Sequence, residues 1–72
     1  MMSNAWETTT EDILIVTHRM GKKISGDKCR EIHDALDHFQ IENEALRAND
    51  LEAQTNAAYN EIERQIKKEN LL

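Results

Sequence analysis

Three side chains of types that bind metals are spaced four residues apart in the middle of the chain. Cys29, His33 and Asp37 follow one another at i, i+4 and i+8, so a helix would place them along one face. Thiolate, imidazole and carboxylate are ligands for zinc and related metals. One helix cannot close a tetrahedral site, and a partner chain or His18 would have to complete it. We therefore predict no metal and no cofactor, with Cys29 at the edge of the core.

The same residues give only a weak indication of catalysis. Cys29 and His33 have the spacing of a thiol nucleophile and its base. The sequence has no Gly-rich loop for a phosphate or an oxyanion, and 72 residues leave little room for a pocket that excludes water. The chain is not predicted to be an enzyme.

Charge is sorted strongly along the sequence. Residues 18–30 contain five bases and one acid, a balance of +4, whereas residues 31–63 contain nine acids and one base, a balance of −8. The acidic stretch contains no Gly or Pro and is predicted to be helical. A basic turn that leads into an acidic helical body indicates an interaction surface.

Two functions could use the basic turn. Its cations surround the predicted start of a helix, where free backbone N–H groups could meet a phosphate. The candidate residues for this anion site are Arg19, Lys22, Lys23, Ser25 and Lys28. Alternatively, helix, turn and helix form a DNA-binding unit whose recognition helix begins near Ser25. Acids at 31, 34 and 37 would repel the duplex, so direct binding to nucleic acid is disfavoured. For the anion site, the simpler interpretation is a solvated turn whose cations offset nearby acids.

The length and composition limit the size of the core. Leu, Ile, Val and Phe together number 15 of the 72 residues, so a monomer would be marginally stable as a single domain over 1–72. A single Cys excludes an intramolecular disulfide, and no signal peptide or membrane span is recognisable. We therefore expect a soluble cytoplasmic protein with no membrane contact that gains buried surface as a homodimer.

Capping signals predict an all-α fold of two or three helices. Residues 1–7 are expected to form a loose terminus. Thr8 and Glu11 have capping-box spacing for a helix over about 9–20, and Gly21 provides its stop. Ser25 can cap a long helix over about 26–48.

The apolar pattern of that long helix predicts both a dimer and a break. Its seam consists of Ile32, Leu36, Phe39, Asn43 and Leu46, which we predict to be the dimer interface. A new seam begins at Leu51, out of phase with the first, and predicts a break at Asn49–Asp50 before a helix over about 50–69 that could fold back as a hairpin. The alternative is one rod over 26–69, roughly 66 Å long at about 1.5 Å per residue. The predicted core comprises Ile13, Val16, Ile24, Ile32, Leu36, Phe39, Leu46, Leu51, Ala58, Ile62 and Ile66.

These features favour a non-enzymatic module that binds and modulates or inhibits another protein. Its acidic helix could imitate a row of phosphates and block a nucleic-acid-binding surface of a regulator. Small acidic helical inhibitors made by viruses and mobile elements share this general composition, although no motif here identifies one of their families. The residues predicted to bind the partner are Phe39, Glu42, Glu44, Arg47, Asp50 and Tyr59.

Overall fold

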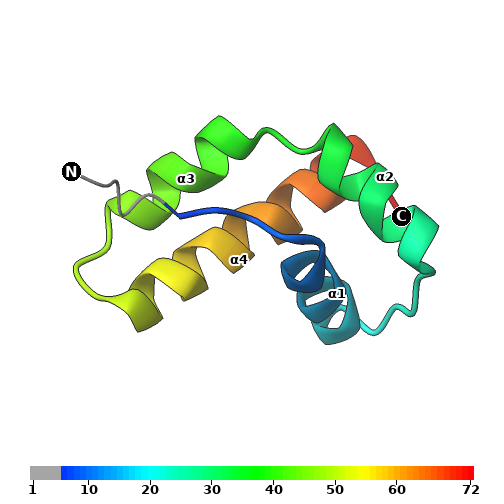
Figure 1. Ribbon diagram of the computed structural model, residues 1–72, viewed down its shortest axis with the longest axis horizontal. Coiled ribbons are helices and arrows are strands. Elements are labelled where there is room, and N and C mark those ends of the chain that lie inside the picture. The colour runs from blue at the N-terminus through cyan, green and yellow to red at the C-terminus, as the bar shows by residue number, and fades with distance from the viewer. Residues whose placement is uncertain (1–5) are drawn as a thin grey trace.

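The computed structural model describes residues 6–72, which form four α-helices and no strand (Figure 1). The all-α prediction is therefore confirmed for this part of the chain, but the number of helices is larger than the two or three predicted. The helices are α1 (Thr10–Arg19), α2 (Gly26–Ala35), α3 (His38–Leu46) and α4 (Leu51–Glu69).

Each helix begins after a polar residue whose side-chain oxygen accepts a hydrogen bond from the backbone N–H three residues later. The four N-cap residues are Thr9, Ser25, Asp37 and Asp50. Such a cap stabilises a helix by about 1 kcal/mol. The α1 capping box uses Thr9 and Asp12, one residue later than the predicted pair, and the α4 cap is Asp50 rather than Asn49.

α1 and α4 each terminate at a residue whose φ lies in the left-handed region. Gly21 follows α1 at φ 79°, where a side chain would be strained, while Lys22 N–H donates to the Thr17 carbonyl at 2.9 Å. Asn70 ends α4 at φ 55°, and Leu71 N–H donates to the Ile66 carbonyl at 3.0 Å. Leu71 then packs against the core.

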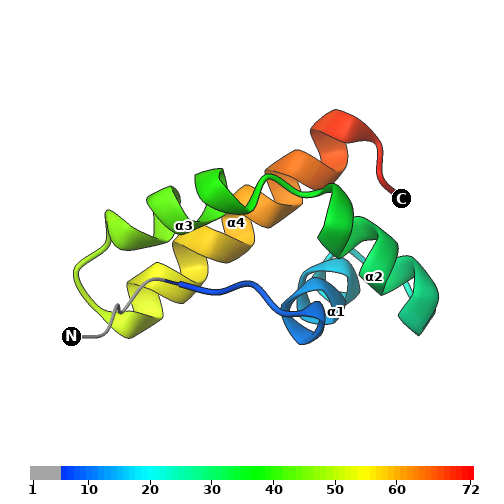
Figure 2. The ribbon, with the colours of Figure 1, turned by 45° about the horizontal axis from the view of Figure 1, so that its top comes forward.

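The helices are arranged around α4. α3 and α4 form an antiparallel hairpin, and α1 packs against both α2 and α4. In the turned view of Figure 2, α3 again lies along the first half of α4, and α1 and α2 lie towards its second half. The buried apolar residues between them are Ile13, Val16, Cys29, Ile32, Leu36, Ile41, Ala45, Ala58, Ile62 and Ile66.

The predicted helix over 26–48 is wrong because the chain breaks at Leu36–Asp37. Leu36 has ψ 151° and Asp37 has ψ 93°, so both leave the helical conformation. The Asp37 carbonyl accepts from Ile41 N–H at 3.2 Å within α3, but the Asp37 N–H has lost its helical partner, and the side-chain amide of Gln65 binds both groups. Asp37 N–H donates to Gln65 Oε1 at 2.7 Å, and Gln65 Nε2 donates to the Asp37 carbonyl at 3.2 Å.

Gln65 is itself held by a buried carboxylate. Its Nε2 also donates to Glu61 Oε2 at 2.9 Å, and Glu61 accepts two hydrogen bonds from Arg64, at 2.8 Å and 2.5 Å. The hydrogen bonds from Arg64 outweigh burial and lower the pKa of Glu61 below its ordinary value. The carboxylate therefore stays charged inside the fold and fixes the amide of Gln65.

The break changes which face of residues 38–46 is buried. Ile41 and Ala45 face α4, whereas Phe39 is 71% exposed and Leu46 is 47% exposed. The predictions of Phe39 and Leu46 as core residues are therefore wrong, and so is that of Leu51, which is 73% exposed beyond the end of the core. Ile24 is only partly buried.

Because the buried face changes at the break, the predicted dimer interface is divided into a buried part and an exposed part. Ile32 and Leu36 fill the core of a single chain and leave no surface for a second copy. Phe39, Asn43 and Leu46 are exposed, and their part in a dimer stays a prediction.

The turn over 47–50 separates α3 from α4, so the alternative of one rod over 26–69 is wrong. Of the loose terminus predicted over 1–7, residues 1–5 lie outside the described residues. Trp6 packs against the core, and its indole N–H donates to the Thr8 hydroxyl at 3.1 Å. Over residues 6–72, none of the helices is long and apolar enough for a transmembrane segment.

Replacing Gln65 by Met should destabilise the fold by about 1–3 kcal/mol, because the backbone N–H of Asp37 would lose its partner and the Asp37 C=O would keep only its bond from Ile41 N–H. The measurement is urea unfolding followed by circular dichroism. Gln54→Met on the same helix is the control and should change stability by less than about 0.5 kcal/mol. Equal effects of the two substitutions would show that the hydrogen bonds to Asp37 do not stabilise the fold.

Candidate functional site

The three candidate metal ligands have separate structural roles. The buried Cys29 thiol donates to the Thr10 carbonyl at 2.9 Å, and burial raises the pKa of the thiol, so it remains protonated. Asp37 caps α3, with its side chain accepting from Gln40 N–H. Among the described residues, no three His, Cys, Asp or Glu side chains come together in a group that could hold a metal.

The two neighbouring histidines also serve the fold. His38 Nε2 lies 2.6 Å from the His33 carbonyl, and His33 Nε2 lies 2.9 Å from the Thr8 carbonyl. A carbonyl can only accept, so each of these nitrogens carries a proton. His38 thereby satisfies a carbonyl in the last turn of α2, and the two rings lie 4.4 Å apart.

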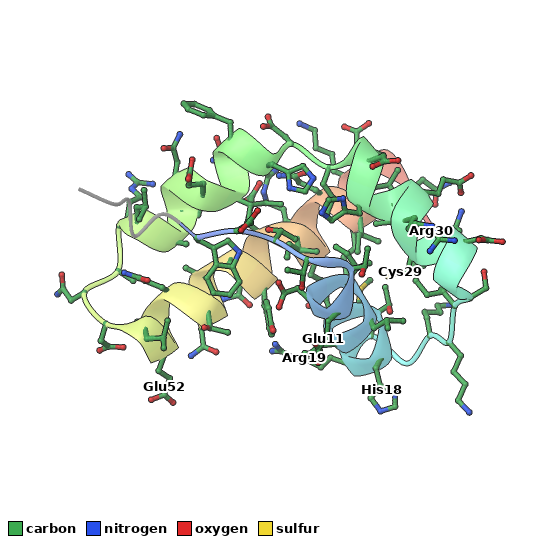
Figure 3. All side chains as sticks on the ribbon, viewed as in Figure 1. Glu11, His18, Arg19, Cys29, Arg30 and Glu52 are labelled. Carbon is green, nitrogen blue, oxygen red and sulfur yellow. The ribbon has the colours of Figure 1, made fainter. Side chains whose placement is uncertain are left out.

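The predicted anion site is dispersed. Lys28 pairs with Glu31 at 3.0 Å, and Arg30 on the same helix pairs with Asp27 at 2.6 Å. The Ser25 hydroxyl already caps α2 by accepting from Lys28 N–H. Figure 3 shows Arg30 on α2 and Arg19 with His18 on α1, in different parts of the molecule. The structure therefore does not gather the five candidates around one anion.

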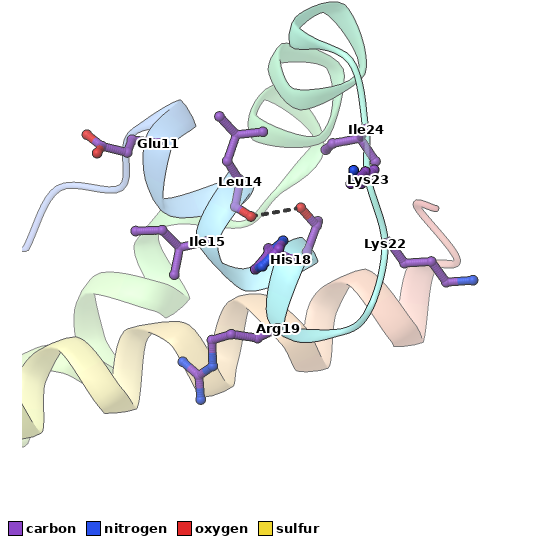
Figure 4. A pocket seen from close by; sticks show the side chains of 9 residues that line it. Glu11, Leu14, Ile15, His18, Arg19, Lys22, Lys23 and Ile24 are labelled. Carbon is purple, nitrogen blue, oxygen red and sulfur yellow. Dashed lines mark hydrogen bonds between the residues drawn. The ribbon is translucent and has the colours of Figure 1, made fainter.

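Three of the candidates, Arg19, Lys22 and Lys23, instead line an apolar groove on the outer side of α1. The groove has a volume of about 540 Å³. Figure 4 shows side chains from α1 and from the turn that follows it around this space. We call it the α1 groove, and its lining residues are Glu11, Leu14, Ile15, Thr17, His18, Arg19, Lys22, Lys23 and Ile24.

A second exposed surface lies on α3, on the side away from α4. Phe39, Glu42, Asn43 and Leu46 are spaced i, i+3, i+4 and i+7 and share one face of the helix, which we call the α3 surface. The turn beyond it ends at the exposed Asp50, and α4 begins with the exposed Leu51 and Glu52. Figure 3 shows Glu52 projecting from the start of α4. This region combines large apolar side chains with acids.

The structure brings together only some of the predicted partner-binding residues. Phe39 and Glu42 lie on the α3 surface, and Asp50 follows in the turn. Glu44 and Arg47 pair with each other at 3.3 Å, and Glu44 also accepts from Gln40 at 3.0 Å. Their charges are partly neutralised, so they contribute less to a charged surface.

Tyr59 lies on the α1 side of α4 and not with the other predicted residues. Its hydroxyl donates to Asp12 Oδ1 at 2.8 Å, and Trp6 packs edge to face on its ring with the centroids 6.1 Å apart. The Arg19 guanidinium carbon lies 5.8 Å from the ring centroid. Tyr59 therefore joins α1 and the N-terminal segment to α4.

Neither the α1 groove nor the exposure of Leu51 was predicted from the sequence. The signal for the groove is the apolar run over residues 13–16, because one face of a helix can bury only part of four consecutive residues. No equally local signal exists for Leu51, which continues the seam of α4 but lies beyond the residues that cover that seam.

Comparisons of the chain with protein-family models, with curated proteins and with solved structures found no match. The assignment of a function therefore rests on the geometry described above.

The Tyr59 contact predicts a shifted titration that can be measured directly. Burial and the Asp12 carboxylate raise the pKa of Tyr59 to about 12, from an ordinary value of 10.0. Because the folded-state pKa is raised, the stabilising contribution is complete below pH 10 and disappears as the pH rises towards 12. Tyr59 is the single tyrosine, so phenolate absorbance reports it alone.

We expect this titration near pH 12 if the helices persist, and Asp12→Asn should lower the pKa of Tyr59 by removing the negative charge. The control, Asp27→Asn on α2, should leave the titration unchanged. A titration at the ordinary pKa with helical circular dichroism intact would contradict the contact between Tyr59 and Asp12.

Proposed function

We propose that this chain is a non-enzymatic binding module that docks on another protein through the α3 surface and thereby modulates it. The observation that carries the proposal is the exposure of Phe39, of which 71% is accessible to solvent on a helix otherwise packed against the core. An exposed aromatic residue with apolar neighbours is typical of an interface anchor.

The support beneath Phe39 suits it to binding. Ile41 and Ala45, on the opposite face of α3, are fully buried against the rest of the molecule. The α3 surface is thus presented by a rigid helix, which reduces the conformational entropy lost when a partner binds. Leu46 lies seven residues after Phe39, two helical turns along the same face, and extends the apolar contact.

The charges around Phe39 indicate which kind of surface the partner would present. Glu42 lies beside Phe39 on α3, Asp50 follows in the adjoining turn, and Glu52 lies at the start of α4. A complementary partner has an apolar pocket with a basic rim, which is the character of many nucleic-acid-binding surfaces. The proposed action is therefore to cover such a surface on a regulator and exclude its nucleic acid.

The alternative functions receive less support from the geometry. A DNA-binding α2 would present Lys28 and Arg30, but both pair with acids on their own helix. Glu31 and Asp34 are exposed farther along the same helix and would repel phosphates. Salt-dependent binding of DNA by the pure protein would nevertheless favour this alternative over the one proposed.

The test begins with affinity capture from the source cells, after which the captured protein is purified and its binding is measured by calorimetry. Phe39→Ala should weaken that binding by more than about tenfold, as expected for an anchor residue. Reversing the charges of Glu42 and Asp50 should weaken it further at low salt and flatten its salt dependence.

Leu72→Ala provides the matched control, since Leu72 is also an exposed apolar residue but lies away from α3. It should leave the affinity unchanged, and all variants should keep the helix content of the native protein. If Lys22→Glu with Lys23→Glu abolished binding while Phe39→Ala did not, the basic turn would be the functional site and the proposal would be wrong.

A further inference from the structure

The outer face of α1 is apolar although no other described helix covers it. Ile13 and Val16 point into the core, whereas their neighbours Leu14 and Ile15 are 44% and 39% exposed. A surface helix normally has one apolar stripe and an opposite polar face. The second apolar face of α1 is therefore suited to contact with another molecule.

The rim of the α1 groove defines the charge of its occupant. Arg19, Lys22 and Lys23 contribute three positive charges around the floor formed by Leu14 and Ile15, against one acid, Glu11 (Figure 4). His18 adds a further polar group at this edge. The complementary ligand is an acidic helix that carries large apolar side chains.

The α3 surface of this same chain has those properties. Phe39 and Leu46 are seven residues apart on one face, which is about 10 Å along a helix. The α1 residues that line the groove, from Glu11 to Arg19, span about 12 Å. Glu42, Asp50 and Glu52 provide the acids opposite the basic rim.

The two surfaces cannot meet within one molecule. α1 and α3 lie towards opposite ends of the long axis in both Figure 1 and Figure 2, and α4 lies between them. The α3 surface also faces away from α4, so any α1 groove that receives it belongs to a different molecule.

We propose that the α1 groove binds the α3 surface of a second copy of this chain, in a head-to-tail arrangement. The contact joins two different surfaces, so a pair leaves one of each free and can add further copies. This goes beyond the proposed docking on another protein and does not depend on it. Because both use the α3 surface, self-association and partner docking compete.

Sedimentation equilibrium of the pure full chain tests the proposal. At low salt and concentrations on the order of 100 µM, which suit a small interface, the native protein should form species larger than a dimer. Leu14→Glu, in the groove, and Phe39→Glu, on the α3 surface, should each give a monomer. An equimolar mixture of these two variants should form one-to-one dimers and nothing larger, because each contributes one intact surface.

Further variants and conditions control the test. Leu72→Glu introduces the same charge at another exposed leucine and should associate like the native protein. Ile15→Glu repeats the groove substitution independently, and circular dichroism verifies that each variant is folded. Lys22→Glu combined with Lys23→Glu should weaken association several-fold, and added salt should weaken association of the native protein.

Other outcomes overturn the proposal. A native protein that stays monomeric at these concentrations has no such contact. If Leu14→Glu still dimerises and Phe39→Glu does not, the α3 surfaces pair with each other, and the reverse result assigns the interface to α1 alone. None of these results involves the partner protein, so they leave the proposed docking function to its own test.

Discussion

The fold depends on the pairing of one side-chain amide with one backbone residue. Gln65 accepts from Asp37 N–H and donates to the Asp37 carbonyl, which also accepts from Ile41 N–H, so the chain can leave the helical conformation between α2 and α3 without leaving the Asp37 N–H unpaired. Glu61 and Arg64 hold the amide in place from within α4. Without this pairing, the Asp37 N–H would have a local backbone partner only if the helix continued through residue 37.

The break determines which surfaces the molecule presents. It turns α3 so that Ile41 and Ala45 reach the core and Phe39 and Leu46 reach solvent. A 72-residue chain has few large apolar residues, and here several of them are outside the core. The core is made mainly of isoleucine and small residues, while the largest exposed apolar side chains lie on α3, on α1 and at the start of α4. That distribution is the physical basis for regarding the molecule as a binding module.

Ion pairs within single helices refine the charge pattern. Lys28 with Glu31, Arg30 with Asp27 and Arg47 with Glu44 are exposed pairs that contribute little to stability. Their effect is to reduce the net field near α2 and the end of α3. The cations along the α1 groove and the acids beside the α3 surface lie outside these pairs, and they give the two surfaces opposite sign.

The sequence by itself determined the features that depend on nearby residues. Caps such as Ser25 and the stop at Gly21 act within one turn, and the phase change after Leu46 indicated the break before α4. The break at Asp37 had a local signal, since Asp37 and Gln40 have capping spacing before an apolar residue, but an uninterrupted apolar seam through Leu36 and Phe39 favoured one helix. Only the tertiary structure decided between them, because Gln65 lies 28 residues away and supplies hydrogen bonds that no local pattern contains. The position of Tyr59 beside Asp12 and the exposure of Phe39 likewise follow from how the helices pack, which a periodic sequence does not specify.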